Sequence, residues 1–254
     1  MTQSSAVEDV FNTPPPKPLP RGLPADPEAP SAASATNSAT AIVADIQRAT
    51  AVTDGQKKAR TDSRPVKIMP RQYETCDPKD LGVLISDMLM ELIRLNDKIP
   101  LKDGKLTRFH SRHLYRAPPG ISCHDYLNRL IQHATLSPPI LLSMVFYIDR
   151  LCAMYPAFTI GSLTVHRFLI TAATVASKGL SDSFWTNSTY ARIGGISTGE
   201  LATLELDFLQ RVSFRIVPQP ETLVDYYCSL IQRSQDYRLE DEPTGVEPMD
   251  EDPP

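Results

Sequence analysis

Two charged residues, Lys178 and Glu205, stand in apolar helical segments, where charges are uncommon. Lys178 ends the segment 163–178, and Glu205 lies inside the segment 200–214. An acid and a base beside apolar surface can form strong hydrogen bonds in a partly dry interface. This combination suits the binding of another protein's helix and is a poor start for an active site. Taken without other information, the base rate for charged residues favours two solvated surface charges.

The other candidates for catalytic or metal chemistry carry little weight. His110 and His113 have no third or fourth ligand at zinc spacing. Cys123 and His124 are neighbours in sequence, but a thiolate–imidazole pair requires proximity in the fold. There is no glycine-rich phosphate loop, and carboxylates are not paired beyond chance. We expect no catalytic residue, no cofactor and no metal, and a protein that is not an enzyme.

The elements that would position the charged pair are helices. Apolar residues recur at helical spacing in several segments, and no segment alternates with period two. The segment from residue 138 to 155 is apolar nearly all round, so other helices should surround it. The segment 162–178 is rich in small residues, which permit close helix approach. We expect an all-α fold with helices over residues 78–97, 123–133, 138–155, 162–178, 183–192, 197–214 and 221–232.

Local signals mark several helix ends. Asp77 and Ser122 are predicted N-caps, and Ser197 with Glu200 has capping-box spacing. Gly179 is predicted to end the helix over 162–178.

Some polar residues near these helices have structural roles in our interpretation. Because Asp149 and Arg150 follow an apolar run, at least one of them should be paired inside the domain. His166 and Arg167 are interpreted as fold residues. Asn187 begins a formal glycosylation sequon, to which we assign no role in a chain that is not secreted.

The two ends differ in composition from the centre. Residues 1–75 are rich in Pro, Ala and Ser with a basic run over 57–71, and residues 239–254 contain seven acids and no base. We expect both to be disordered, with a folded domain over 76–238. That domain carries 17 bases and 15 acids, which gives no argument for nucleic acid. The N-terminus lacks an apolar signal segment, so we expect a cytoplasmic or nuclear protein without a membrane span.

A series of short motifs resembles a cyclin box of the Pho type, called P- or U-type in plants. The resemblance covers about half of the chain, over residues 109–233, and implies a single five-helix cyclin box with an extra helix before it and a further helix after it. The motifs occur in this order: Phe109-His110-Ser111, Asp125-Tyr126-Leu127, Tyr147-Ile148-Asp149-Arg150, Val165-His166-Arg167-Phe168-Leu169-Ile170-Thr171, Ala176-Ser177-Lys178 and Gly194-Gly195-Ile196-Ser197-Thr198-Gly199-Glu200-Leu201.

The resemblance implies a non-catalytic subunit that binds and activates a cyclin-dependent serine/threonine protein kinase, as one partner of a heterodimer. Phosphate or nutrient signalling and cell-cycle control are the processes it suggests. In cyclins, a lysine ending the third box helix and a glutamate in the fifth contact the kinase's regulatory helix, and Lys178 and Glu205 match these positions. The matching apolar positions are Val175, Leu209, Phe214 and Ile216.

The chain departs from other cyclins in two places. Gly179 stands where related cyclins often carry a large apolar residue, so some kinase contact area is expected to be missing. Residues 119–124 do not reproduce the substrate-docking patch of cell-cycle cyclins, and that role is not transferred. The alternative is a cyclin-fold adaptor for nucleic acid or transcription that binds no kinase.

Overall fold

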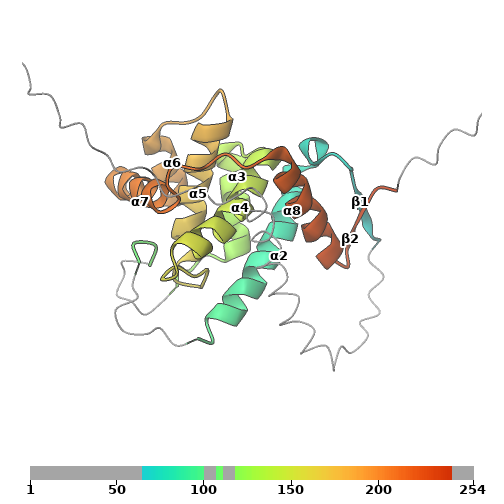
Figure 1. Cartoon of the computed structure of the whole chain (residues 1–254), viewed down its shortest axis with the longest axis horizontal. Helices are drawn as coiled ribbons and strands as arrows, with labels where there is room; N and C mark the ends of the chain where they lie inside the picture. The colour runs from blue at the N-terminus through green and yellow to red at the C-terminus, as the bar shows by residue number, and fades with distance from the viewer. Residues whose placement is uncertain (1–64, 100–106, 111–117, 242–254) are drawn as a thin grey trace, which may run out of the picture.

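The computed structural model describes residues 65–99, 107–110 and 118–241 of the 254-residue chain. Within these ranges helices make up nearly all of the regular secondary structure, and the expectation of an all-α fold is confirmed (Figure 1). The elements in chain order are β1 (Lys67–Met69), the short 3-10 helix η2 (Tyr73–Thr75), α2 (Pro78–Asn96), α3 (Cys123–Ala134), α4 (Pro138–Met154), α5 (Val165–Leu180), α6 (Asn187–Gly194), α7 (Thr198–Arg211), α8 (Pro220–Arg233) and β2 (Tyr237–Leu239).

Helix α5 lies at the centre, in contact with α3, α4, α6 and α7 (Figure 1). Its middle consists of small residues that are fully buried, so the surrounding helices can approach its backbone closely. The two buried threonines, Thr171 and Thr174, donate to the carbonyls of Arg167 at 2.7 Å and Ile170 at 2.8 Å. Their hydroxyls are therefore satisfied without solvent. Helix α4 packs against α5 on one side and α8 on another, which accounts for its apolar surface all round.

The predicted N-caps are confirmed. Asp77 accepts a hydrogen bond from the amide of Lys79 at 2.9 Å, and Ser122 accepts from the amide of Asp125 at 3.0 Å. Ser197 accepts from the amide of Glu200 at 3.1 Å. Each cap satisfies one of the amides that the first turn of a helix leaves free.

Several predicted helix boundaries are wrong, including the end of α7, which lies at Arg211 instead of Phe214. Gly179 does not end α5, which continues through Leu180, and α5 begins at Val165 instead of Ser162. Leu180 is half-buried against the core, and this packing extends the helix past a glycine that local rules interpret as a stop. Helix α6 begins at Asn187, after the N-cap Thr186, instead of at Ser183.

The structure also contains one short pair of strands that periodicity did not indicate. Strands β1 and β2 form a parallel pair in which Lys67 lies opposite Tyr237 and Met69 opposite Leu239. Three residues are too few to show a period-two pattern, so alternation could not have indicated these strands. The pair joins residues from both predicted disordered ends, so ordered structure begins before the expected boundary at residue 76 and includes Leu239. The remaining residues of those ends, 1–64 and 242–254, lie outside the described residues.

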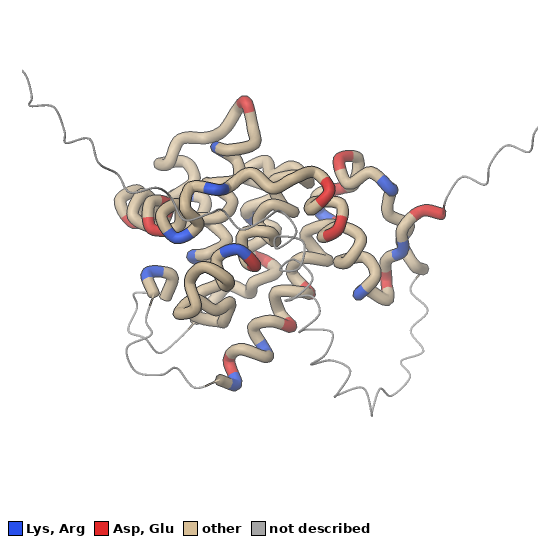
Figure 2. Tube along the Cα trace, viewed as in Figure 1, with Lys and Arg blue, Asp and Glu red and all other residues tan. Residues whose placement is uncertain are grey.

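Charge is distributed evenly over the folded part. Figure 2 shows lysine, arginine, aspartate and glutamate scattered along the described trace, with no run of one sign dominating it. None of the described helices is both long enough and apolar enough to cross a membrane.

Candidate functional site: a charged pair between two helices

Lys178 and Glu205 form an ion pair between the end of α5 and the middle of α7. The Lys178 ammonium Nζ donates to Glu205 Oε1 at 2.6 Å. The lysine side chain is 30% exposed and the glutamate side chain 15%. The packing of α7 on α5 therefore brings together the two residues that the sequence singled out, and neither is a fully solvated charge.

Asn187 fixes the other oxygen of the same carboxylate. Its side-chain amide Nδ2, at the start of α6, donates to Glu205 Oε2 at 2.9 Å. Both carboxylate oxygens are thus held, which sets the plane of the group. The sequence marks Asn187 only as part of a sequon and does not indicate its hydrogen bond to Glu205. Its role depends on how α6 packs beside α7, which no local pattern reveals.

The predicted apolar positions divide into three classes of exposure. Phe214 is 63% exposed, whereas Leu209 and Ile216 are half-buried against the core. Val175 is only 2% exposed. Val175 therefore cannot present a surface in this conformation and belongs to the core.

Further exposed apolar residues lie next to the residues that contact the pair. Leu206 follows Glu205 in α7, and Phe184 and Trp185 shortly precede Asn187. Val217 follows Ile216, whose side chain lies against the residue after Lys178. Isolated exposed apolar residues are ordinary, but a group around a half-buried ion pair is typical of an interaction surface. Leu206 escaped detection because it falls off the buried stripe of α7, and Phe184, Trp185 and Val217 because they lie between helices. The exposed fractions are 52% for Phe184, 48% for Trp185, 53% for Leu206 and 63% for Val217.

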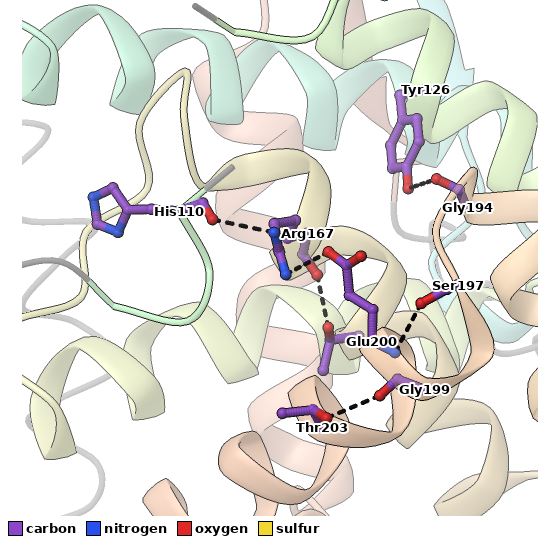
Figure 3. Close-up of polar contacts among 9 residues, drawn as sticks. His110, Tyr126, Arg167, Gly194, Ser197, Gly199, Glu200 and Thr203 are labelled. Carbon is purple, nitrogen blue, oxygen red and sulfur yellow. Dashed lines mark hydrogen bonds and ion pairs between the residues drawn. The ribbon is translucent and has the colours of Figure 1, made fainter. Parts of the chain in front are cut away.

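Arg167 belongs to a structural network, as expected. It pairs with Glu200 at the start of α7, and its Nη1 donates to the carbonyl of His110 at 3.2 Å (Figure 3). In the same view Tyr126 donates to the carbonyl of Gly194 at 2.9 Å. These bonds tie α5 to the first turn of α7, and α3 to the end of α6. They therefore fix the helices that carry Lys178 and Glu205.

The expectation for Asp149 and Arg150 is confirmed for the aspartate. Asp149 is buried in α4 and accepts a hydrogen bond from the hydroxyl of Tyr226 in α8. Burial raises the pKa of Asp149 to about 7, and the bond from Tyr226 opposes that rise. The guanidinium of Arg150 lies 6.0 Å from the centre of the Phe146 ring, and burial, with the nearby charge of Arg215, lowers the pKa of Arg150.

The candidates for other chemistry occupy structural positions. His110 is buried, its Nδ1 accepts from the amide of Thr107 at 3.0 Å, and burial lowers its pKa. His113 lies outside the described residues. Cys123 is buried with a thiol pKa raised by burial to about 12, whereas His124 is exposed and bonds to Ser86 at 2.9 Å. Across the described ranges, no three His, Cys, Asp or Glu side chains gather as metal ligands would.

Comparison with known proteins decides the family. The model of the cyclin family matches residues 36–216, which is more than half of the chain. The chain belongs to the cyclin family. Its relatives are of the Pho type, and α3 to α7 are the five helices of this cyclin's box, preceded by α2 and followed by α8.

Three relatives from fungi and a plant illustrate the relationship. The "Nuc-1 negative regulatory protein preg" of Neurospora crassa is 57% identical over 77% of this chain and 40% of its own length. The "PHO85 cyclin PHO80" of Saccharomyces cerevisiae is 42% identical over 73% of this chain and 63% of its own length. "Cyclin-U4-1" of Arabidopsis thaliana is 34% identical over 59% of this chain and 74% of its own length. The cyclin thus spans less than two thirds of the two fungal relatives.

Proposed function

We propose that this cyclin is a non-catalytic regulatory subunit that binds and activates a cyclin-dependent serine/threonine protein kinase. The observation that carries the proposal is the half-buried Lys178–Glu205 pair, held between α5 and α7 beside exposed apolar residues. The proposed contact surface consists of this pair with Leu206, Leu209, Phe214 and Ile216. Val175 supports the surface from the core.

The pair can recognise the end of a helix. Lys178 has three N–H donors and uses one of them on Glu205, so two remain for carbonyl groups of a partner. Each oxygen of Glu205 accepts one hydrogen bond from the described residues and keeps capacity for a partner's amide. The terminal turns of a helix have unpaired amides and carbonyls of this kind. Because the two charges already neutralise each other, docking does not have to desolvate an isolated ion.

Activation would be a matter of position. Held by the cyclin, the regulatory helix of the kinase stays inward, so that the kinase's own lysine–glutamate pair forms and aligns the nucleotide phosphates. The reaction, ATP and magnesium belong to the kinase. The cyclin supplies a rigid surface, which the buried network around Arg167 and Glu200 keeps in place.

The names of the relatives suggest the pathway. The yeast relative is named as a cyclin of PHO85, and the Neurospora relative as a negative regulator of Nuc-1. We extend this to a kinase of the PHO85 kind and to phosphate or nutrient signalling, in the cytoplasm or the nucleus.

The test is binding of the purified full chain to purified yeast PHO85. The variants are Lys178→Ala, Glu205→Ala and Phe214→Ala, and the matched control is Val224→Ala, which removes an exposed apolar residue of α8. Loss of one partner of a desolvated interfacial bond costs about 2–5 kcal/mol. We therefore expect Kd to rise at least roughly thirtyfold for the two charge variants, together with a loss of kinase activation on a peptide substrate. Val224→Ala should bind like the parent.

Equal affinities for the parent and all three variants would show that the surface is wrong. Absence of PHO85 binding, together with salt-dependent binding to non-specific DNA, would favour the nucleic-acid adaptor.

A further inference from the structure

The segment that follows α7, residues 213–217, has an unusual backbone. Ser213 has a φ of 53° and Phe214 a φ of 56°, so two successive residues occupy the left-handed region. This region is uncommon for residues with a side chain and a true outlier for a bulky aromatic. Such a conformation persists only where the surroundings determine it, and such sites cluster where proteins bind partners.

Hydrogen bonds hold this segment at both ends. The amide of Phe214 donates to the carbonyl of Leu209 at 2.8 Å, and the amide of Arg215 donates to the carbonyl of Val212 at 3.1 Å. The carbonyl of Ile216, two residues after Phe214, accepts a hydrogen bond from the buried hydroxyl of Tyr147 in α4 at 2.7 Å. The backbone is therefore fixed on both sides of the exposed Phe214 ring.

The side chain of Ile216 lies directly over Gly179 of α5. A Cβ at position 179 would stand 2.8 Å from Ile216 Cδ1 and 3.5 Å from Ile216 Cγ1. With glycine at position 179 this approach needs no adjustment, whereas a Cβ there would require the end of the Ile216 side chain to move. Gly179 lies in the last turn of α5 with a helical backbone, where it makes the helix less stable than alanine would. The contact with Ile216 offers a physical reason for a glycine at this place.

We propose that Gly179 is a positioning residue that shapes the apolar part of the proposed kinase-contact surface. It lets residues 213–217 pack on α5 immediately beside Lys178, so that Ile216 and Phe214 supply the apolar contact that a large side chain at position 179 would otherwise supply. Gly179 itself is exposed beside this contact. This inference rests on the proposed function.

A double-mutant cycle tests the contact. Gly179→Ala adds the clashing atom, and Ile216→Val removes Cδ1, the atom that it would meet. If residues 213–217 must shift to relieve the clash, only a fraction of molecules keeps the competent surface, and affinity for PHO85 falls by that fraction. We expect Gly179→Ala to raise the Kd for PHO85 about three- to tenfold. Ile216→Val should change this Kd less than about twofold. The double variant should bind nearly as tightly as Ile216→Val alone.

Two further measurements separate this role from a general loss of structure. Alanine favours the helix over glycine, so the melting temperature of Gly179→Ala should not fall. In the free cyclin, the δ1-methyl resonance of Ile216 should shift in Gly179→Ala. Affinity falling without a loss of stability, with rescue by Ile216→Val, supports the proposal.

The results also distinguish this inference from the proposed function. If Lys178→Ala and Glu205→Ala weaken PHO85 binding but Gly179→Ala does not, the role of Gly179 is overturned and the kinase surface stands. If the double variant binds as weakly as Gly179→Ala alone, the steric account is overturned. If the parent does not bind PHO85, both proposals fail together.

Discussion

Removing either member of the Lys178–Glu205 pair should destabilise the free cyclin, and the two losses should be unequal. Lys178→Ala leaves the more buried partner, since the Glu205 side chain is 15% exposed and would keep only its bond from Asn187. Glu205→Ala leaves Lys178, which is 30% exposed and has a flexible stem that can carry the ammonium into water. The lysine variant should therefore be the less stable one.

The magnitudes follow from this partial burial. Exposed ion pairs contribute about 0–1 kcal/mol, and breaking a fully buried pair costs about 3–5 kcal/mol. For a pair between these limits, we expect Glu205→Ala to lower the free energy of unfolding by about 1 kcal/mol. Lys178 also lies in the last turn of α5, where a positive charge is favoured by roughly 0.3–1 kcal/mol. Lys178→Ala should thus cost about 2 kcal/mol.

Urea denaturation of both single variants and of the double variant measures these values. Lys98→Ala, which removes an exposed lysine beyond α2, is the matched control and should change stability by less than about 0.5 kcal/mol. The double variant should be more stable than the sum of the single losses predicts, because neither charge is then left unpaired. A larger loss for Glu205→Ala than for Lys178→Ala would refute the reasoning from burial.

Two further predictions concern the core. The raised pKa of Asp149, about 7 against 3.8 for an ordinary aspartate, means that the folded chain holds a proton that the unfolded chain loses. This contribution to stability is full below about pH 4 and disappears as the pH rises to about 7. The free energy of unfolding of the parent, measured by urea denaturation and compared with that of Asp149→Asn, should therefore fall across that window. A difference that does not change with pH would contradict this prediction. Gly194→Ala should cost about 1–3 kcal/mol, because its Cβ would stand 2.5 Å from Ile170 Cγ1. Gly199→Ala, with no atom within 4 Å of its Cβ, is the control in thermal melting; equal melting temperatures would show that the site near Ile170 yields without cost.

The helices were predictable because the signals for them are local. Apolar spacing places α2, α3 and α4 to within a few residues, and the caps Asp77, Ser122 and Ser197 mark the first turns. Each of these signals depends on residues within one or two turns of chain. The family resemblance then located Lys178 and Glu205 on neighbouring helices, which periodicity alone could not have done.

The remainder of the candidate site depends on contacts between elements. Asn187 reaches Glu205 only because α6 packs beside α7, and the burial of Val175 depends on which side of α5 faces the centre. The strands β1 and β2 lie far apart in sequence and are three residues each, so neither has a pattern of its own. In all three cases the information lies in the tertiary arrangement.

Gly179 shows how such contacts override a local rule. A glycine after a basic residue at the end of an apolar run is a standard signal for the end of a helix. That signal rests on the ability of glycine to adopt positive φ, and in this cyclin the glycine with positive φ is Gly195, among the described residues. Gly179 stays helical because Leu180 still packs on the core. Its lack of a side chain matches the position of Ile216, which lies where a Cβ at residue 179 would stand. The sequence offers two physical reasons for a glycine, freedom of the backbone and lack of a side chain, and only the position of Ile216 reveals that the second applies at residue 179.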